Sequence, residues 1–299
     1  MDRASTALRE LVAAELAEPV DPRVSAMAGT IAALYPGAAR AVLFYGSCLR
    51  EKQLDGLMLD FYLIVRDYRE AYGKSWLAAA NRLIPPNVFP FEKEGLTAKY
   101  AVLDEADFER ECSPAARSVS VWARFAQPSR LVWSADDSAR ERAVRVVAEA
   151  APTLFKLTLP VMRGDDRHDP LAVFRVGFAL TYGAELRAER RQRPSSIVEA
   201  DPDRYLRIGE AILAERPAGE GDLDREKARW RARQRKGKAL TVVRLLKASA
   251  TFANGIDYLA WKINRHAGTA IEVKPWQRRW PLVAGLILLP RLLRRGAIR

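Results

Sequence analysis

The sequence predicts an α+β fold, with a mixed sheet and helices in the first half of the chain and helices alone in the second. Up to about residue 135, short apolar runs rich in β-branched and aromatic residues alternate with helical patterns. Beyond Asp136 the strand-like runs stop and only helical periodicity remains. The chain has 299 residues, of which 49% are hydrophobic, so it can bury a substantial core and wholesale disorder is excluded.

The first elements are two helices and a strand. Residues 7–18 place their leucines on one helical stripe, and residues 24–34 form a second apolar helical segment that ends at Pro36 and Gly37. Residues 41–45 are a short apolar run that leads into Gly46 and Ser47, as expected for a strand followed by a turn.

Three further strands and two helices complete the first half. Residues 59–65 have the length and composition of a buried strand, and residues 68–83 predict a helix closed by two prolines. Residues 97–103 predict the next strand, Asp104 opens a helix after it, and residues 130–133 predict a last short strand.

Five helices are predicted in the second half, separated by Gly- and Pro-containing breaks. They cover residues 140–150, 153–162, 170–189, 203–215 and 241–266. We therefore expect an α/β domain over residues 1–135, a helical domain over residues 136–275 and an amphipathic C-terminal segment over residues 276–299.

Positive charge is concentrated in the last quarter of the chain. Residues 225–299 contain 19 Lys and Arg but 3 Asp and Glu, whereas the remaining residues contain slightly more acids than bases. A basic block of this kind favours a polyanion such as an anionic lipid surface, a phosphorylated substrate or nucleic acid. A solvated helix face is the simpler alternative, but it does not account for the loss of acidic residues over the same stretch.

The C-terminal segment combines an apolar run with tryptophans at one end and arginines at the other. Trp276 and Trp280 precede residues 282–289, which are apolar, and three arginines follow. The run is too short to span a bilayer, so the pattern favours a segment lying in the headgroup region of an anionic membrane. The alternative is a terminal helix that packs on the domain. Because the N-terminal region carries early acids and no secretory pattern, we expect a cytoplasmic protein at the inner face of the membrane.

The strongest local signal for chemistry is Gly46-Ser47 followed by Asp60. A strand that ends in Gly-Ser lets backbone N–H groups and a small hydroxyl approach phosphate oxygens closely. An aspartate within an apolar strand is costly to bury unless it is paired or holds a cation, so Asp60 is a natural ligand for Mg²⁺ beside bound phosphates. An ordinary turn and a strand-edge acid remain the alternative. Cysteine and histidine are too few for a disulfide framework or a structural zinc site, with 2 of each.

This pattern resembles the nucleotidyltransferase fold of the polymerase-β type, in which a Gly-Ser turn precedes acidic residues on the next strand. The usual second carboxylate on that strand is absent, because Met58 and Tyr62 flank Asp60 at the alternate positions. Over most of its length the chain is also similar to the mitochondrial-type phosphatidate cytidylyltransferases, which are peripheral CDP-diacylglycerol synthases. The matching stretches are residues 45–47, 58–65 with Asp67, 99–102, 124–132, 181–187 and 244–255. The family's histidine-containing elements after the aspartate strand are missing.

The resemblance implies transfer of CMP from CTP to phosphatidic acid, which yields CDP-diacylglycerol and pyrophosphate. It implies Asp60 as the ligand of Mg²⁺, with Glu185 as a second catalytic acid that reaches in from the helical half. The groups expected to contact the nucleotide or its phosphates are Gly46, Ser47, Lys99, Arg187, Arg244 and Lys247. For Lys99, Glu185 and Arg187, a solvent-facing structural role is the alternative.

Two other functions remain open from the sequence. One is a polymerase-β-type enzyme that acts on another acceptor, such as a different lipid phosphate, a small molecule or RNA. The other is an inactive relative bound to a membrane, which the missing second carboxylate and histidines favour. No recognised nucleic-acid-binding module is present, so a nucleic-acid partner is not expected.

Overall fold

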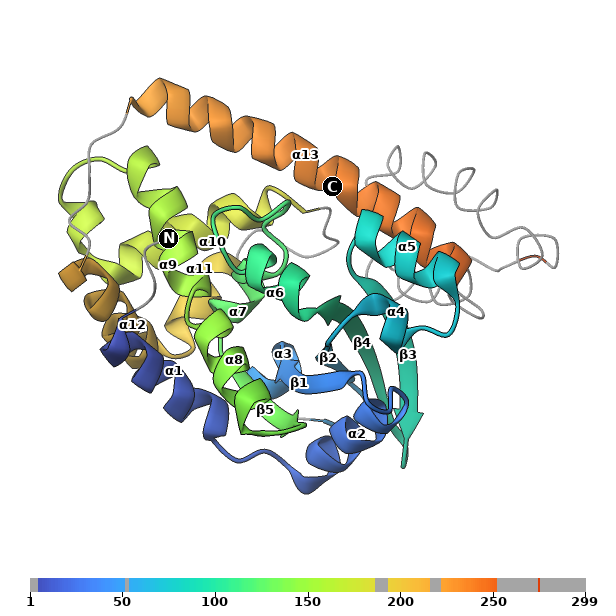
Figure 1. The fold of residues 1–299 in the computed structure, drawn as a ribbon. Coiled ribbons are helices and arrows are strands. Elements are labelled where there is room, and N and C mark those ends of the chain that lie inside the picture. The colour runs from blue at the N-terminus through green and yellow to red at the C-terminus, as the bar shows by residue number, and fades with distance from the viewer. Residues whose placement is uncertain (1–4, 52–53, 186–192, 216–221, 252–273, 275–299) are drawn as a thin grey trace.

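The computed structural model describes residues 5–51, 54–185, 193–215, 222–251 and 274. A five-stranded mixed sheet with helices forms one part, and helices alone form the other (Figure 1). This confirms the predicted α+β class. The strands are β1 (Ala39–Tyr45), β2 (Met58–Val65), β3 (Asn87–Lys93), β4 (Leu96–Asp104) and β5 (Ser129–Ser134).

The sheet has the order β3-β4-β2-β1-β5, and only the central β2–β4 pair is parallel. Four strands were predicted, and β3 was missed. β3 contains Pro90 and charged residues, which weaken a strand pattern. Pro90 is tolerated because β3 is an edge strand. On the open side of an edge strand, a proline without an N–H costs no hydrogen bond to a neighbouring strand.

The helices before β5 are mostly short and begin at capping side chains. Ser5 accepts a hydrogen bond from the Leu8 N–H, and Asp104 accepts one from the Asp107 N–H. The segment predicted as a single helix over residues 68–83 is two helices, because the chain turns at Gly73. They are α1 (Thr6–Ala17), α2 (Pro22–Ala33), α3 (Ser47–Glu51), α4 (Tyr68–Ala71), α5 (Ser75–Leu83), α6 (Glu105–Glu111) and α7 (Trp122–Phe125).

After β5 the described residues contain helices and no strand, as predicted. The elements are α8 (Asp137–Val147), α9 (Ala150–Thr158), the 3₁₀ turns η1 (Leu159–Val161) and η2 (Asp165–His168), α10 (Pro170–Tyr182), α11 (Arg193–Glu199), α12 (Pro202–Glu215) and α13 (Leu223–Thr251). The sequence did not predict α11, because its Pro-Ser-Ser stretch was taken as a break. The prediction also placed the start of the last helix near Thr241, whereas α13 begins at Leu223.

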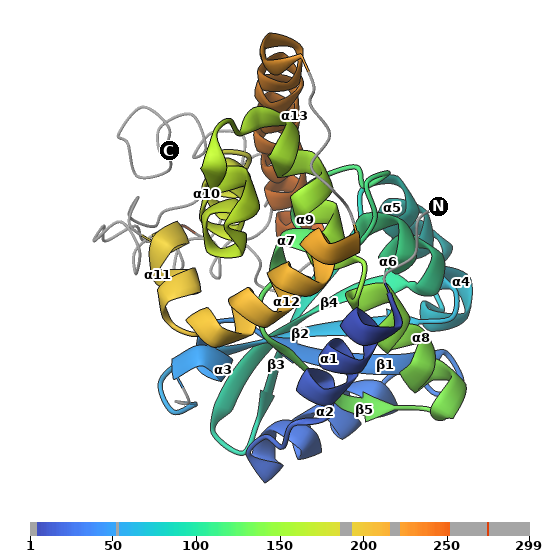
Figure 2. The same cartoon turned by 90° about the vertical axis from the view of Figure 1, so that its left-hand side faces the viewer.

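The two faces of the sheet bury different sets of residues. Alternate strand residues such as Leu43, Tyr62 and Leu103 pack with α1 and with helices of the second half, whereas Phe44, Phe61 and Val102 pack with α2 and the α4–α5 region. Figure 2 shows α1, α9 and α12 on one side of the sheet and α2 at the other. The first of these cores is continuous from Leu8 to Trp230, across the expected boundary at residue 135.

A buried ion pair joins α1 to α12 within this shared core. Arg204 donates through Nε and Nη2 to the Glu15 carboxylate and through Nη1 to the Ala126 carbonyl, 3.1 Å away. Glu15 also accepts a hydrogen bond from the Ser129 N–H. Burial alone would lower the pKa of Arg204, but Glu15 together with Tyr205 and Asp201 raises it, and the net pKa is raised. The pair and its hydrogen bonds link four elements.

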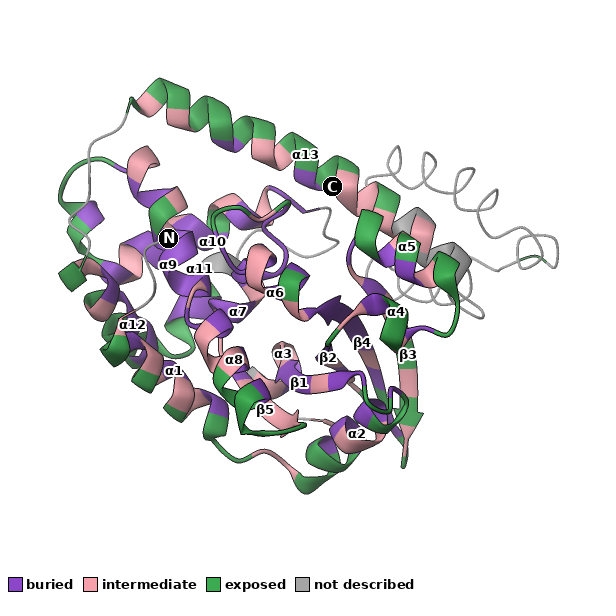
Figure 3. Cartoon of the chain, viewed as in Figure 1, coloured by how far each residue is buried: buried purple, intermediate pink, exposed green. Residues whose placement is uncertain are grey.

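The long helix α13 crosses both parts of the molecule and is held closely at its middle. Trp230 Nε1 donates to the Leu157 carbonyl over 2.7 Å, and one heptad later Gly237 packs against the backbone of Ala184. A Cβ on Gly237 would lie 2.3 Å from the Ala184 carbonyl oxygen. Figure 3 shows that the outer side of α13 is exposed. None of the helices in the described residues is long and apolar enough to cross a membrane.

We expect Gly237→Ala to lower the free energy of unfolding by about 1–3 kcal/mol, because the added methyl must push α13 away from α10. Chemical denaturation would measure the change. The matched control is Gly29→Ala in α2, where nothing lies within 4 Å of the added Cβ and the higher helix propensity of alanine should stabilise the protein. Equal effects at the two positions would contradict the close contact at Gly237.

Candidate functional site

Gly46, which directly follows β1, lies against Asp60 of the neighbouring strand β2. β1 ends at Tyr45, Gly46 takes a φ of +100°, and α3 starts at Ser47. A Cβ on Gly46 would lie 2.9 Å from Asp60 Oδ2, so only glycine allows this approach. The structure therefore brings together the turn and the acid that the sequence singled out, with the Asp60 side chain 18% exposed.

Strand register adds Lys99 to this site. Tyr45, Asp60 and Lys99 occupy paired positions across β1, β2 and β4. Asp60 and Lys99 therefore share one face of the sheet, and Lys99 Nζ lies 2.7 Å from Asp60 Oδ1. The face is the one on which Tyr62 and Ile64 pack toward the helical part. Lys99 is thus an internal partner of the acid.

The acids around Asp60 do not form a metal site by themselves. Among the described residues, no group of three acidic, cysteine or histidine side chains could hold a metal ion. Asp60 Oδ1 is shielded from solvent and accepts no well-directed hydrogen bond, and its neighbouring cation is the Lys99 ammonium. A resident Mg²⁺ held by protein ligands alone does not fit this donor set. A Mg²⁺–nucleotide complex, which brings its own phosphate oxygens, fits with Asp60 as the protein ligand.

Glu185 is held by an arginine that the sequence analysis did not assign to the site. Glu185 follows the C-terminus of α10 and accepts a hydrogen bond from Arg124 Nη1 at 3.1 Å. Burial opposes the charge on Arg124, but Glu185 together with Tyr62 and Tyr45 raises its pKa, and the net pKa is raised. Burial is the main cause that raises the pKa of Tyr45, and the charge of Asp60 adds to it. Arg124 lowers this pKa and Glu185 raises it, so both lie near Tyr45 as well. Glu185 therefore belongs to the same region as Asp60, as a partner of Arg124.

Arg244 and Lys247 fix α13 to two loops beside the sheet. Arg244 donates to the Pro85 carbonyl at 2.8 Å and to the hydroxyls of Ser118 and Ser120. The Ser120 carbonyl in turn accepts a hydrogen bond from Arg124.

Lys247 donates to the carbonyls of Ile84 and Pro86. Burial is the main reason that the pKa of Lys247 falls to about 7, and the nearby Arg244 adds to it. Burial likewise lowers the pKa of Arg244. Arg244 and Lys247 were both predicted to contact phosphates. In this structure both bind backbone carbonyls, and Arg244 also binds two serine hydroxyls. Arg187 and the segment 276–299 lie outside the described residues.

We expect Gly46→Ala to remove any nucleotide binding at this turn, because the new methyl would displace the Asp60 carboxylate and alanine tolerates a φ of +100° poorly. Isothermal calorimetry with Mg²⁺ and each of the four ribonucleoside triphosphates would measure the loss. Gly56→Ala is the matched control, since Gly56 also has a positive φ of +73° but nothing within 4 Å of a Cβ. Both variants should lose stability, by about 1–2 kcal/mol from the backbone term, and only Gly46→Ala should lose binding.

Comparison with known proteins gives weak structural likeness and no sequence match. No protein-family model matches the chain, and no curated protein matches its sequence. The structure is similar to the crystal structure of a nucleotidyltransferase-like protein from Exiguobacterium sibiricum, with a TM-score of 0.30 and 13% sequence identity. The match covers 91% of this chain and 92% of the other. The function must therefore be argued from the chain's own residues.

Proposed function

We propose that this protein transfers a nucleotidyl group from a nucleoside triphosphate to a phosphate-bearing acceptor at Asp60. The observation that carries the proposal is the contact of Asp60 with the Gly46-Ser47 turn, with Lys99 on the neighbouring strand. In this reaction an acceptor oxygen forms a bond to the α-phosphorus, the bond from that phosphorus to the bridging oxygen breaks, and pyrophosphate leaves. The chemistry needs positioning and charge stabilisation more than a protein nucleophile.

Each residue of the site has a role in this proposal. Gly46 lets the backbone approach the triphosphate without a Cβ in the way, and Ser47 offers an N–H and a hydroxyl at the start of α3. Lys99 would exchange its contact with Asp60 for a phosphate oxygen when nucleotide binds. Arg124 keeps a positive charge beside Tyr45 and Tyr62, where it would oppose the negative charge of the bound phosphates.

Mg²⁺ would enter with the nucleotide and neutralise part of its charge, with Asp60 as the protein ligand. We place the triphosphate beside Asp60 and against the Gly46-Ser47 turn, because this geometry offers one carboxylate for the cation and several donors for phosphate. Glu185, which is bound to Arg124, orients that arginine in this proposal.

The finer proposal is that the nucleotide is CTP, the acceptor is phosphatidic acid and the product is CDP-diacylglycerol. It is supported by the motif resemblance and by the excess of basic residues in the last quarter of the chain, which suits an anionic membrane surface. Peripheral binding through residues 276–299 belongs to the same proposal.

The test is to incubate the purified full-length chain with each of the four ribonucleoside triphosphates, Mg²⁺ and phosphatidic acid in vesicles, and to follow pyrophosphate release and labelled lipid. CDP-diacylglycerol formed with CTP alone supports the finer proposal. Pyrophosphate release with a different nucleotide or acceptor supports transfer but contradicts the lipid assignment. Nucleotide binding without product from any lipid, small-molecule phosphate or RNA acceptor would make the protein the inactive relative.

A further inference from the structure

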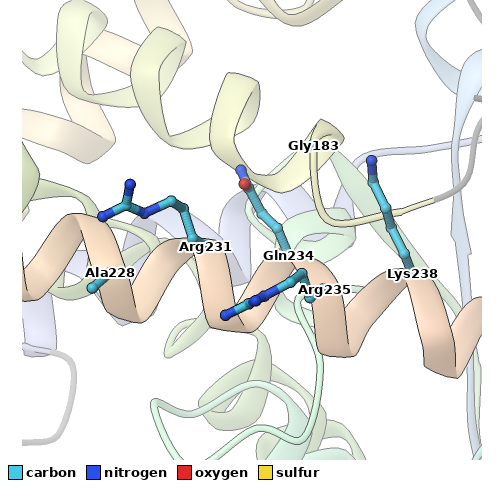
Figure 4. Close-up of a pocket in the computed structure, with 6 residues that line it drawn as sticks. All are labelled: Gly183, Ala228, Arg231, Gln234, Arg235 and Lys238. Carbon is cyan, nitrogen blue, oxygen red and sulfur yellow. The ribbon is translucent and has the colours of Figure 1, made fainter.

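A basic groove lies between α13 and the turn after α10, apart from the Asp60 site. Its volume is about 540 Å³, and it is lined by Gly183, Ala228, Arg231, Gln234, Arg235 and Lys238. Figure 4 shows Arg231, Gln234 and Lys238 rising from α13 on the side where the Gly183 turn lies. None of the residues that form the Asp60 site lines the groove. The groove is therefore a separate place where a ligand fits.

The charges in this groove are of one sign. Arg231, Arg235 and Lys238 lie about one helical turn apart on one face of α13 and are exposed. No described residue forms an ion pair with any of them, and no described carboxylate lines the groove. Like charges at this spacing on a helix repel each other. An anion bound between them would remove this cost.

Two other arginines on the same helix have partners outside the groove. Arg229 is paired with Glu226, and the Arg233 guanidinium stacks on the Trp230 ring at 4.9 Å. The three groove cations form no ion pair with a described residue. The same is true of other exposed cations of α13 such as Lys236, so what distinguishes the three is that they line the groove.

The floor of the groove is fixed by close contacts between α13 and α10. Gln234 Nε2 donates to the Leu180 carbonyl over 3.2 Å, and a Cβ on Gly183 would lie 2.7 Å from that same nitrogen. Gly237 packs on the Ala184 backbone one turn further along. Because these contacts fix the helix that carries the cations, its backbone does not need to be ordered when a ligand binds, which lowers the entropy cost of binding.

We infer that this groove is a second ligand site, specific for a phosphomonoester or pyrophosphate group, which Arg231 and Arg235 grip through their guanidinium groups with Lys238 as a point charge. Planar guanidinium forks match phosphate oxygens in pairs, whereas Lys supplies charge without that geometry. The volume suits a small phosphorylated molecule or the headgroup of a phospholipid. The site does not depend on nucleotidyl transfer at Asp60.

The experiment measures binding of three probes to the full chain by calorimetry: inorganic pyrophosphate, glycerol 3-phosphate, and dioctanoyl phosphatidic acid below its micelle concentration. The double variant Arg231→Ala, Arg235→Ala should bind the preferred probe at least about tenfold more weakly, since each charge-assisted contact is worth about 1.5–3 kcal/mol. Preference for pyrophosphate or glycerol phosphate identifies a soluble ligand, and preference for phosphatidic acid identifies a headgroup.

Two controls make the result decisive. Arg225→Ala, Lys236→Ala removes the same charge from exposed positions of α13 outside the groove and should change affinity less than about threefold. Pyrophosphate and phosphatidic acid are also leaving group and acceptor of the proposed transfer, so both double variants are compared with and without Asp60→Asn. The weakening by Arg231→Ala, Arg235→Ala should be the same in the two backgrounds, so failure of the transfer proposal is seen separately. Equal weakening by the two double variants, or no binding of any probe, would overturn the inference.

Discussion

Replacing Asp60 with asparagine should reduce nucleotidyl transfer by about 10³-fold, while the protein stays folded. Asparagine keeps the size that fits against Gly46 but loses the negative charge that would meet a cation–phosphate complex. It also leaves the Lys99 ammonium without its ion partner 2.7 Å away, so the pair changes from neutral to positively charged. Turnover by pyrophosphate release, together with the circular dichroism spectrum and melting temperature, would measure both effects.

The matched control for this prediction is Asp55→Asn. Asp55 precedes the same strand, but its side chain is 80% exposed and pairs with Arg23 at the surface. Its loss should change turnover less than about twofold, since exposed ion pairs contribute little to the local structure. If the two variants had equal activity, Asp60 would have no part in the reaction and the proposed site would be wrong.

Replacing Arg204 with methionine should lower the free energy of unfolding by about 3–5 kcal/mol, because Glu15 would remain buried with its charge uncompensated. The side chains of Arg204 and Glu15 are only 7% and 11% exposed, so water cannot take over the lost contacts. The Ala126 carbonyl would lose its donor as well. Urea denaturation followed by tryptophan fluorescence would measure the change.

The double variant Glu15→Met, Arg204→Met separates the pair from the packing around it. Removing both charges takes away the desolvation cost together with the attraction, so the double variant should be markedly more stable than the single one. Arg23→Met serves as a surface comparison, because that arginine is 44% exposed and solvent screens its ion pairs, so its loss should change stability little. A loss as small as this at Arg204 would show that its ion pair contributes no more than an exposed one.

The parts of the fold with strong periodicity could be predicted from the sequence. Apolar runs located β1, β2 and β4, and Asp104 correctly marked the start of α6. β3 could not be predicted, because its stability comes from pairing with β4 while Pro90 obscures its pattern. The start of α13 was missed since its first half is rich in arginine on nearly all sides, and only tertiary contacts such as that of Trp230 fix the buried side.

The site was predictable where it depends on local sequence and unpredictable where it depends on distant pairing. The proximity of Gly46 and Asp60 could be predicted from the two consecutive strands that carry them. The contact between Asp60 and Lys99 follows from the register of two parallel strands, which a sequence leaves open. Arg124 and Glu185 are 61 positions apart in the sequence, and no sequence pattern predicts that they pair. The available clue was that a buried acid such as Glu185 needs a basic partner elsewhere in the chain.

Helix α13 is held by hydrogen bonds at Trp230 and at Arg244, which are 14 residues and therefore about 21 Å apart along the helix. Trp230 binds the helical layer, and Arg244 binds loops that border the sheet. A single continuous helix therefore sets the spacing between the helical layer and the loops that border the sheet.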